Sequence, residues 1–217
     1  MAAVQINNPG SAKHRARTGE GKRERREAIV DRARVFLAEH GFDDIRLADI
    51  AAELGLAKAT IYLYFPTKQD LFASILREEM EAWWLHFLEG AAAETPGPDF
   101  GASFQGAGLL IRLMTSLHMS IEAGLSRSSL LELKSWFRDF VRDASLDIEA
   151  RYPALRGKGP VFMLRLYALA VGGAQLAYPP REVAALIEAE DSLGLFRVDF
   201  IRFIAESIDA MYHGMTD

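Results

Sequence analysis

The sequence predicts an all-α protein, and three observations lead to this fold class. Apolar residues recur at spacings of three and four along most of the chain, as they do on one face of a helix. No segment shows the sustained alternation of apolar and polar residues that a half-buried strand requires. Glycine and proline divide the chain into stretches of helical length. We therefore expect a series of helices joined by short connections.

Composition limits the size of the core and the choice of partners. The chain has 217 residues, of which 50% are hydrophobic, enough to bury a core in one large or two small domains. Residues 1–68 carry twelve Lys and Arg against nine Asp and Glu, whereas the remainder carries thirteen against twenty-one. A basic first third and an acidic remainder predict contact with nucleic acid at one end only.

The absence of cysteine excludes disulfides, thiolate nucleophiles and cysteine-ligated zinc. The N-terminus has no apolar signal core, and the longest charge-free apolar run, residues 166–180, is shorter than the ~20 residues that span a bilayer. We interpret this run as a buried helix. The expected location is the cytoplasm, with no membrane contact.

Residues 1–21 form a polar segment that cannot bury enough apolar surface to fold alone, and we expect a flexible basic arm. Residues 13–26 carry seven Lys and Arg against two Glu. Two interpretations stand side by side. The segment is either a solvated tail or an arm that contacts phosphates or the minor groove of a duplex.

The helices follow in order from Lys22. The first ends at Gly41, the second at Gly55 and the third at Pro66, while the Thr67 hydroxyl can cap the fourth. A segment rich in alanine, proline and glycine, residues 90–101, is expected to be a loop. The expected helices span residues 22–40, 47–54, 58–65, 67–89, 104–123, 127–151, 160–178, 181–190 and 197–213.

Residues 49–65 have the pattern of a helix-turn-helix. Ala51 is small where a second helix must pass over it, and Gly55 suits a left-handed backbone just after the first helix. Apolar residues fill the small core between the helices, at Ile50, Leu54, Leu56 and Ile61. The alternative is an ordinary helical hairpin with a glycine turn. Hydrogen-bonding groups on the outer face favour the helix-turn-helix, whose second helix enters the major groove: Lys58, Thr60, Tyr62 and Tyr64, with Lys68 placed for a phosphate.

Across residues 24–75 the sequence closely resembles the TetR family of repressors. The resemblance is carried by Gly41-Phe42, Asp49-Ile-Ala, Leu54-Gly-Leu, Lys58-Ala-Thr-Ile-Tyr-Leu-Tyr-Phe, and Lys68 with Leu71. It implies a three-helix helix-turn-helix domain over residues 22–68 and a helical bundle for effector binding and dimerisation over residues 69–217. The residues that it implies as contacts to double-stranded operator DNA are Lys58, Thr60, Tyr62, Tyr64 and Lys68.

Two positions depart from the family pattern. Many members have serine where this chain has Ala57, which removes one hydroxyl contact. Many have a threonine or serine N-cap where this chain has Arg46, and an arginine there is either a solvated surface charge or a phosphate contact. Tyr62 and Tyr64 are two residues apart and point in different directions, so that one can pack inward with Phe65 while the other faces DNA.

Two C-terminal helices, near residues 160–178 and 197–213, have more apolar surface than one core contact covers. Residues 166–178 are apolar on every side except at Gln175, and Gly172-Gly173 allows another helix to approach closely. The last helix carries an isoleucine stripe and a separate phenylalanine group. A homodimer built on these helices explains both features and suits an inverted-repeat operator. The alternative is a thicker core within one protomer.

The resemblance also implies a small-molecule pocket among the central helices, connected to the helix at residues 67–89. Aromatic and methionine side chains there suggest a mainly apolar effector, with His118 or Arg112 as a polar anchor. The candidate ligand-binding residues are Trp84, Phe87, Met114, His118, Phe137 and Tyr167.

Other classes of function fit less well. The five histidines lack metal-ligand spacing, and neither a Gly-x-Ser-x-Gly elbow nor a phosphate-binding glycine loop is present, so we expect no enzyme, no metal and no cofactor. A helical adaptor that binds only protein would not need Lys58, Thr60 and Lys68 around a helix-turn-helix core. The expected function is a repressor that a small apolar effector releases from an inverted-repeat operator.

Overall fold

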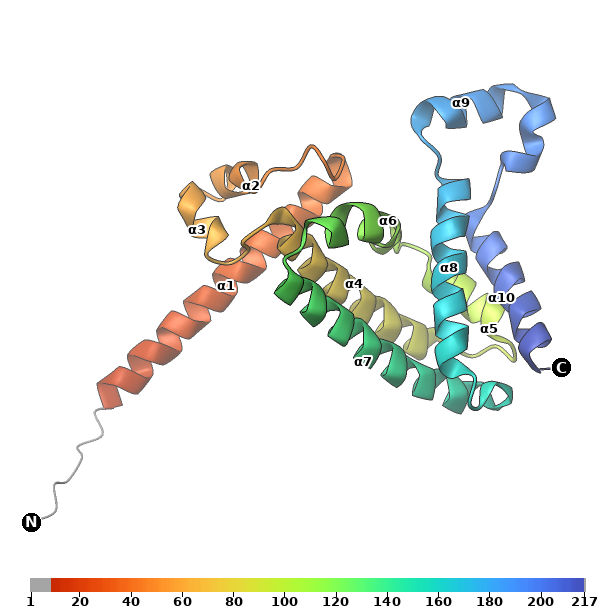
Figure 1. The fold of residues 1–217 in the computed structure, drawn as a ribbon, viewed down its shortest axis with the longest axis horizontal. Helices are drawn as coiled ribbons and strands as arrows, with labels where there is room; N and C mark the ends of the chain where they lie inside the picture. The colour runs from red at the N-terminus through yellow and green to blue at the C-terminus, as the bar shows by residue number, and fades with distance from the viewer. Residues whose placement is uncertain (1–8, 217) are drawn as a thin grey trace, which may run out of the picture. The chain divides into compact units, whose positions relative to one another are not determined.

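The computed structural model describes the backbone of residues 9–216 and the side chains of residues 19–216, and within these ranges every regular element is helical (Figure 1). The all-α fold class is thus confirmed. Backbone contacts divide the chain into two compact units, Met1–Leu71 and Phe72–Asp217. Each unit is described by itself below.

The first unit contains α1 (Pro9–Glu39), α2 (Leu47–Glu53), α3 (Lys58–Tyr62) and the start of α4 (Lys68–Gly90). The C-terminal half of α1 buries one apolar face, and α2 and α3 pack against each other beside it. An ion pair between Arg32 and Glu53 joins α1 to the end of α2. The fully buried side chains of this small core include Ile29, Ala33, Leu37, Ile45, Ile50 and Ile61.

The first helix begins earlier than predicted, at Pro9 instead of near Lys22. Residues 9–21, expected to belong to a flexible arm, continue the helix, and the rest of the expected arm lies outside the described residues. Extension of an existing helix is cheap because each added residue contributes one hydrogen bond without a new nucleation step. Further along, Arg23 and Glu27 form an ion pair at i and i+4.

The second unit is built around α4, α7 (Arg127–Arg151), α8 (Gly159–Ala177) and α10 (Phe200–Thr216). The indole of Trp84 on α4 donates to Asp147 on α7, and Trp136 on α7 donates back to Glu81 on α4, at 2.9 and 3.1 Å. α8 packs against α7, α10 and α6 (Gly108–Ser116). The turn between α7 and α8 contains η3 (Pro153–Leu155).

The segment expected to be a loop, residues 90–101, contains most of α5 (Pro96–Ser103), so that prediction was wrong. Proline in the first turn is compatible with a helix because the first amide groups have no intrahelical partner. The Asp99 carboxylate accepts from the backbone of Ala92 and Ala93 and from the Tyr152 hydroxyl, which secures the start of α5. Burial, together with this bond, raises the pKa of the Tyr152 phenol well above its usual range.

The close approach of α5 to α10 depends on glycine. A Cβ at Gly97 would overlap the carbonyl oxygen of Ala205, and one at Gly101 would lie 3.1 Å from the Ala205 Cβ. The Gly97 amide donates to Asp209 Oδ1 at 2.8 Å, which holds the two helices in register. Phe100, between the two glycines, is completely buried.

The expected helix at residues 104–123 is divided into three parts. Gly106, with φ of +79°, separates α5 from α6. The π-helix η1 (Leu117–Ile121) and the 3-10 turn η2 (Glu122–Gly124) then follow α6 directly. π-Helical turns within α-helices often occur at functional sites, and Leu117 and His118 of this turn line the cavity described below.

α8 is apolar enough and long enough to pass a membrane-span test by composition, with 33% of the tested window buried. The core helix of a soluble protein passes the same test, and α8 packs against three helices of its own unit. The expected close approach at Gly172-Gly173 occurs at Gly173, where a Cβ would lie 2.7 Å from the Phe203 ring of α10.

Between α8 and α10 the chain forms α9 (Arg181–Ala189) and the 3-10 segment η4 (Asp191–Phe196), neither of which contains a buried residue. In Figure 1 these elements extend beyond the ends of α8 and α10. The Arg197 guanidinium donates to the carbonyl oxygens of Ile187 and Glu188, so it caps the end of α9. Hydrogen bonds within residues 181–197 therefore hold this segment together.

Replacement of Gly97 by alanine is expected to destabilise the second unit. The added methyl group meets the backbone of α10, which cannot move without loss of the Asp209 bond, and overpacking of this kind costs about 2 kcal/mol. Gly214→Ala is the matched control because nothing lies within 4 Å of a Cβ at that position of α10. Urea unfolding measures both variants, and equal midpoints for the two would contradict the role of Gly97.

Candidate functional site

The turn between α2 and α3 is the local feature that positions the first site. Gly55 adopts φ of +64°, a left-handed conformation that costs little only for glycine. The amide of Leu56 then donates to Ala51 O at 2.8 Å and closes the turn. Ala51 is 1% exposed and Ile61 is completely buried, because α3 packs directly against α2.

The side chains of α3 divide into a buried side and an exposed side. Lys58 and Tyr62 are exposed, Thr60 and Tyr64 are half-buried, and Phe65, just after the helix, is buried. The sequence left open which tyrosine faces outward, and Tyr62 is the more exposed of the two, with 42% of its surface accessible. Ala57 occupies the N-cap position and makes no side-chain cap.

Four of the six predicted DNA-binding residues line one groove of about 430 Å³, which lies within the first unit. They come from three places in the chain: Arg46 precedes α2, Lys58 and Tyr62 belong to α3, and Lys68 begins α4. With Asp43 as the one carboxylate of the lining, the groove has an excess of positive charge. Thr60 and Tyr64 do not line it.

The N-terminus of α4 at this groove is capped by a reciprocal pair. The Asp70 amide donates to Thr67 Oγ1 at 3.1 Å, as the sequence predicted, and the Thr67 amide donates to Asp70 Oδ2 at 3.1 Å. The pair satisfies amide donors of the first turn and fixes the start of α4 beside the groove.

Lys68 has a structural role that the sequence did not predict. Its ammonium donates to the carbonyl oxygens of Phe42 and Asp43, at 3.0 and 3.2 Å, and lies 5.0 Å from the centre of the Phe42 ring. One of its three N–H groups is left for an external acceptor. Arg46 is exposed at the N-cap of α2 and makes no side-chain cap, as expected from its departure from the family pattern.

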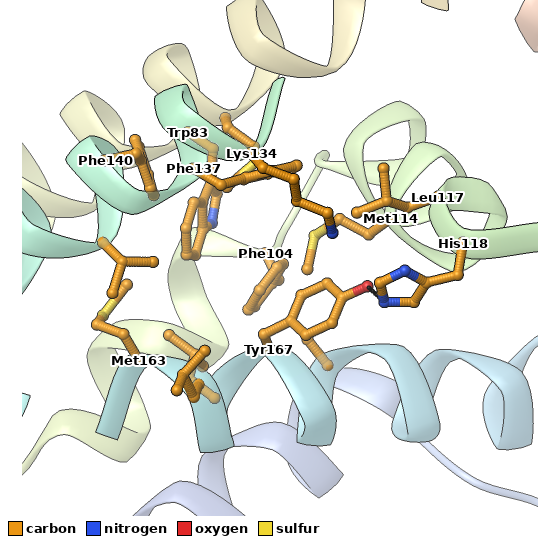
Figure 2. A pocket seen from close by; sticks show the side chains of 15 residues that line it. Trp83, Phe104, Met114, Leu117, His118, Lys134, Phe137, Phe140, Met163 and Tyr167 are labelled. Carbon is orange, nitrogen blue, oxygen red and sulfur yellow. Dashed lines mark hydrogen bonds between the residues drawn. The ribbon is translucent and has the colours of Figure 1, made fainter. Parts of the chain in front are cut away.

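The second unit encloses a mainly apolar cavity of about 320 Å³ between α4, α6, α7 and α8 (Figure 2). Of the six residues predicted to bind a ligand, Met114, His118, Phe137 and Tyr167 line it. The lining also includes eleven residues that were not among the candidate ligand-binding residues, which are Met80, Trp83, Phe104, Leu117, Lys134, Phe140, Val141, Met163, Leu164, Leu166 and Ala170.

The other two predicted residues, Trp84 and Phe87, lie in the core and do not line the cavity. The Trp84 ring stacks on Phe87 at 4.9 Å, and Phe87 stacks on Phe100 at 4.2 Å between ring centres. The neighbouring residue Trp83 faces the cavity instead, with its indole nitrogen bonded to Ser103 Oγ at 3.1 Å. The helical spacing of Met80 and Trp83, three residues apart, is the signal that shows that they share a face.

Polar groups gather at one end of the cavity. The Tyr167 hydroxyl is 3.1 Å from His118 Nε2, and His118 Nδ1 is 3.1 Å from Glu122 Oε2. Lys134 of α7 donates to the other Glu122 oxygen at 2.6 Å, and Figure 2 shows its ammonium directed toward the same end as Tyr167. Burial raises the pKa of the Tyr167 phenol, and the Glu122 charge adds to the effect. Arg112, the other anchor considered, lines a different hollow beside Tyr178.

Comparison with known families gives two matches. The family described as "Bacterial regulatory proteins, tetR family" matches residues 29–75, which include α2, α3 and the start of α4. The family described as "Tetracyclin repressor-like, C-terminal domain" matches residues 100–217, more than half of the chain.

Similar individual proteins include regulators from several bacteria. The chain is 39% identical over 59 residues to the fatty acid metabolism regulator protein of Bacillus subtilis, covering 27% of this chain and 30% of that protein. It is 38% identical over 82 residues to the transcriptional repressor LfrR of Mycolicibacterium smegmatis, covering 37% and 39%. The aligned part thus spans little more than a third of these relatives at most. A TetR-family regulator from Agrobacterium tumefaciens has a similar fold, with a TM-score of 0.53, 18% identity and coverage of 90% and 99%.

The uncapped start of α3 leads to a stability prediction. Ala57→Ser places a hydroxyl where it can accept from the amides of the first turn, and a serine N-cap stabilises by about 0.5–1 kcal/mol relative to alanine. Ala59→Ser, at an exposed position inside the same helix, is the control and is expected to be neutral or slightly destabilising. Urea unfolding distinguishes the two, and an equal shift for both variants would show that the cap does not form.

Proposed function

The chain belongs to the TetR family of bacterial transcriptional regulators, and from this premise we propose that it represses genes by binding an inverted-repeat operator as a homodimer, which a small, mainly apolar effector releases. The family consists of DNA-binding regulators and not of enzymes. The repression cycle, the dimer and its cytoplasmic location form the proposal.

The groove of the first unit is the observation that carries the proposal. It gathers Arg46, Lys58, Tyr62 and Lys68 from three separate elements around the exposed side of α3. Lysine and arginine neutralise phosphates, and exposed hydroxyl and amine groups on a recognition helix contact base edges. We assign Lys58 and Tyr62 to the major groove, Arg46 and Lys68 to the flanking phosphates, and Thr60 and Tyr64 to the margin of the interface.

The basic part of α1 adds a second contact to the proposal. Lys22, Arg23, Arg25 and Arg26 lie on α1 before its packed half, and Arg26 also lies 5.2 Å from the Phe65 ring, just after α3. The residues before them carry further Lys and Arg. We propose that this N-terminal segment contacts operator phosphates and adds to the salt dependence of binding.

The proposed route from effector to DNA runs along α4. This helix supplies Lys68 to the groove and Met80 and Trp83 to the cavity. A ligand that repacks Met80 and Trp83 changes the helix that also begins at the operator-binding groove. An effector that binds more tightly when α4 is in one position than in another shifts the helix toward that position, and this is sufficient to change the affinity for DNA.

The dimer proposal rests on apolar surface that the protomer leaves exposed. Val161 and Leu164 on α8 are 48% and 61% exposed, and Ala168 follows at a spacing of four residues. The apolar stripe of α10 contributes less than its sequence suggested, because Ile204 and Ile208 are completely buried within the protomer. The interface predicted near residues 160–178 and 197–213 therefore depends chiefly on α8 in this proposal.

A mobility-shift titration with DNA from upstream of the gene tests the operator contacts. Lys58→Ala and Tyr62→Ala are each expected to weaken specific binding about tenfold, since a good base or phosphate contact contributes roughly 1–3 kcal/mol. Arg138→Ala, which removes a cation from an exposed position on α7, is the control and should leave binding unchanged. Equal binding of the wild type and both α3 variants would refute the assigned interface.

The same titration over a range of salt concentrations tests the N-terminal segment. Deletion of residues 1–20 is expected to weaken binding and to reduce the slope of log affinity against log salt, because fewer counterions are released. An unchanged slope would remove residues 1–20 from the interface.

Light scattering of the purified chain tests the dimer. The wild type is expected to be a dimer at micromolar concentration, whereas Val161→Glu, at an exposed position of α8 that does not line the cavity, should shift the equilibrium toward the monomer by placing a charge in an apolar interface. Leu195→Glu on η4 is the control, since this side chain is 87% exposed outside the assigned helices. A monomeric wild type would defeat this part of the proposal.

A further inference from the structure

The cavity has two chemically different parts, and together they restrict its ligand. The inner part is lined by rings and methionines, such as Trp83, Phe104, Phe140 and Met163. The rim carries His118, Lys134 and Tyr167. His118 and Lys134 are about half exposed, at 59% and 48% of their side-chain surface, so a polar ligand group placed there keeps part of its hydration.

Glu122 organises this rim although it does not line the cavity. Its side chain is 13% exposed, and both of its oxygens are engaged, one by His118 and the other by Lys134. Because each carboxylate oxygen has its own partner, Glu122 holds both His118 and Lys134 in place. His118 and Lys134 are therefore positioned from one anchor on η2.

The hydrogen-bond roles at the rim follow from this arrangement. When His118 donates its Nδ1–H to the Glu122 carboxylate, its Nε2 accepts from the Tyr167 hydroxyl. The Tyr167 ring is then fixed as a wall of the cavity. Lys134 has given one N–H to Glu122, so its ammonium retains two N–H donors and no acceptor.

Building on the proposed function, we infer that the ligand is an amphipathic monocarboxylate, whose apolar body fills the ring-lined part of the cavity and whose carboxylate accepts hydrogen bonds from Lys134. A carboxylate is an acceptor-only group with a charge opposite to that of the ammonium, and charge-assisted bonds of this kind are the stronger ones. The apolar lining favours an unbranched or aromatic body. The volume of about 320 Å³ lies at the small end of ligand pockets, which favours a compact molecule.

Calorimetric titration of the full chain with octanoate, methyl octanoate and octanol tests this inference directly. The three probes share one apolar body and differ only in the head. The wild type is expected to bind octanoate about fivefold or more tightly than either neutral probe, the scale of a charge-assisted hydrogen bond at a half-exposed site. Equal affinities for acid and ester, or no binding of any probe, would overturn the assignment.

Substitutions at Lys134 test whether its ammonium binds the carboxylate of the ligand. Lys134→Met is expected to abolish the preference for octanoate while methyl octanoate binds as in the wild type, and Lys134→Arg should retain it. Arg138→Met is the control, because Arg138 lies one turn further along α7, pairs with Asp139 and does not line the cavity. A preference that persists in Lys134→Met would overturn the role of this lysine, and circular dichroism checks that each variant is folded.

A parallel measurement of operator affinity separates this inference from the proposed function. Selective octanoate binding that leaves operator affinity unchanged would support the ligand class and contradict effector release. Release by the neutral probes as readily as by octanoate would support the proposed function and overturn the ligand class.

Discussion

The backbone of one residue, Gly55, sets the position of α3, the helix on which the basic groove of the first unit depends. Its left-handed conformation, φ of +64°, turns the chain between α2 and α3 within four residues, and the bond from Leu56 N–H to Ala51 O closes that turn. A residue with a Cβ would be strained there by about 1 kcal/mol or more. Because Ile61 is then buried against α2, Lys58 and Tyr62 are left on the outer side, beside Arg46 and Lys68.

The second unit contains an apolar cavity within an otherwise packed core. The Trp83 ring, which lines this cavity, is held by its hydrogen bond to Ser103 and so resists collapse. Interiors of proteins are close-packed, so a hollow of about 320 Å³ lined by rigid rings is a cost in stability that a ligand can offset. The polar rim, anchored by Glu122, faces the more exposed end of this hollow.

These two sites share one continuous helix. α4 begins with the Thr67–Asp70 cap at the groove and continues to the aromatic wall of the cavity. The cap stabilises the start of the helix, and stacked rings stabilise its later turns. The Lys68 ammonium ties α4 to the carbonyl groups after α1 and keeps one donor for the phosphate contact that we propose.

The sequence by itself determined the fold class, the helix-turn-helix core and the Thr67 cap, because these depend on contacts within a few residues along the chain. Turn glycines and caps act over three to five positions, which a single sequence displays. Only the tertiary structure decided that Arg46, Lys58, Tyr62 and Lys68 line one groove, since they come from separate parts of the chain. The tertiary structure decided that residues 96–103 form a helix, since α5 is held by α10 through Gly97 and Asp209. It also decided that Trp83 faces the cavity and Trp84 the core. Adjacent aromatic residues look alike in sequence, and the partner that distinguishes Trp84 is Asp147, 63 residues further along the chain.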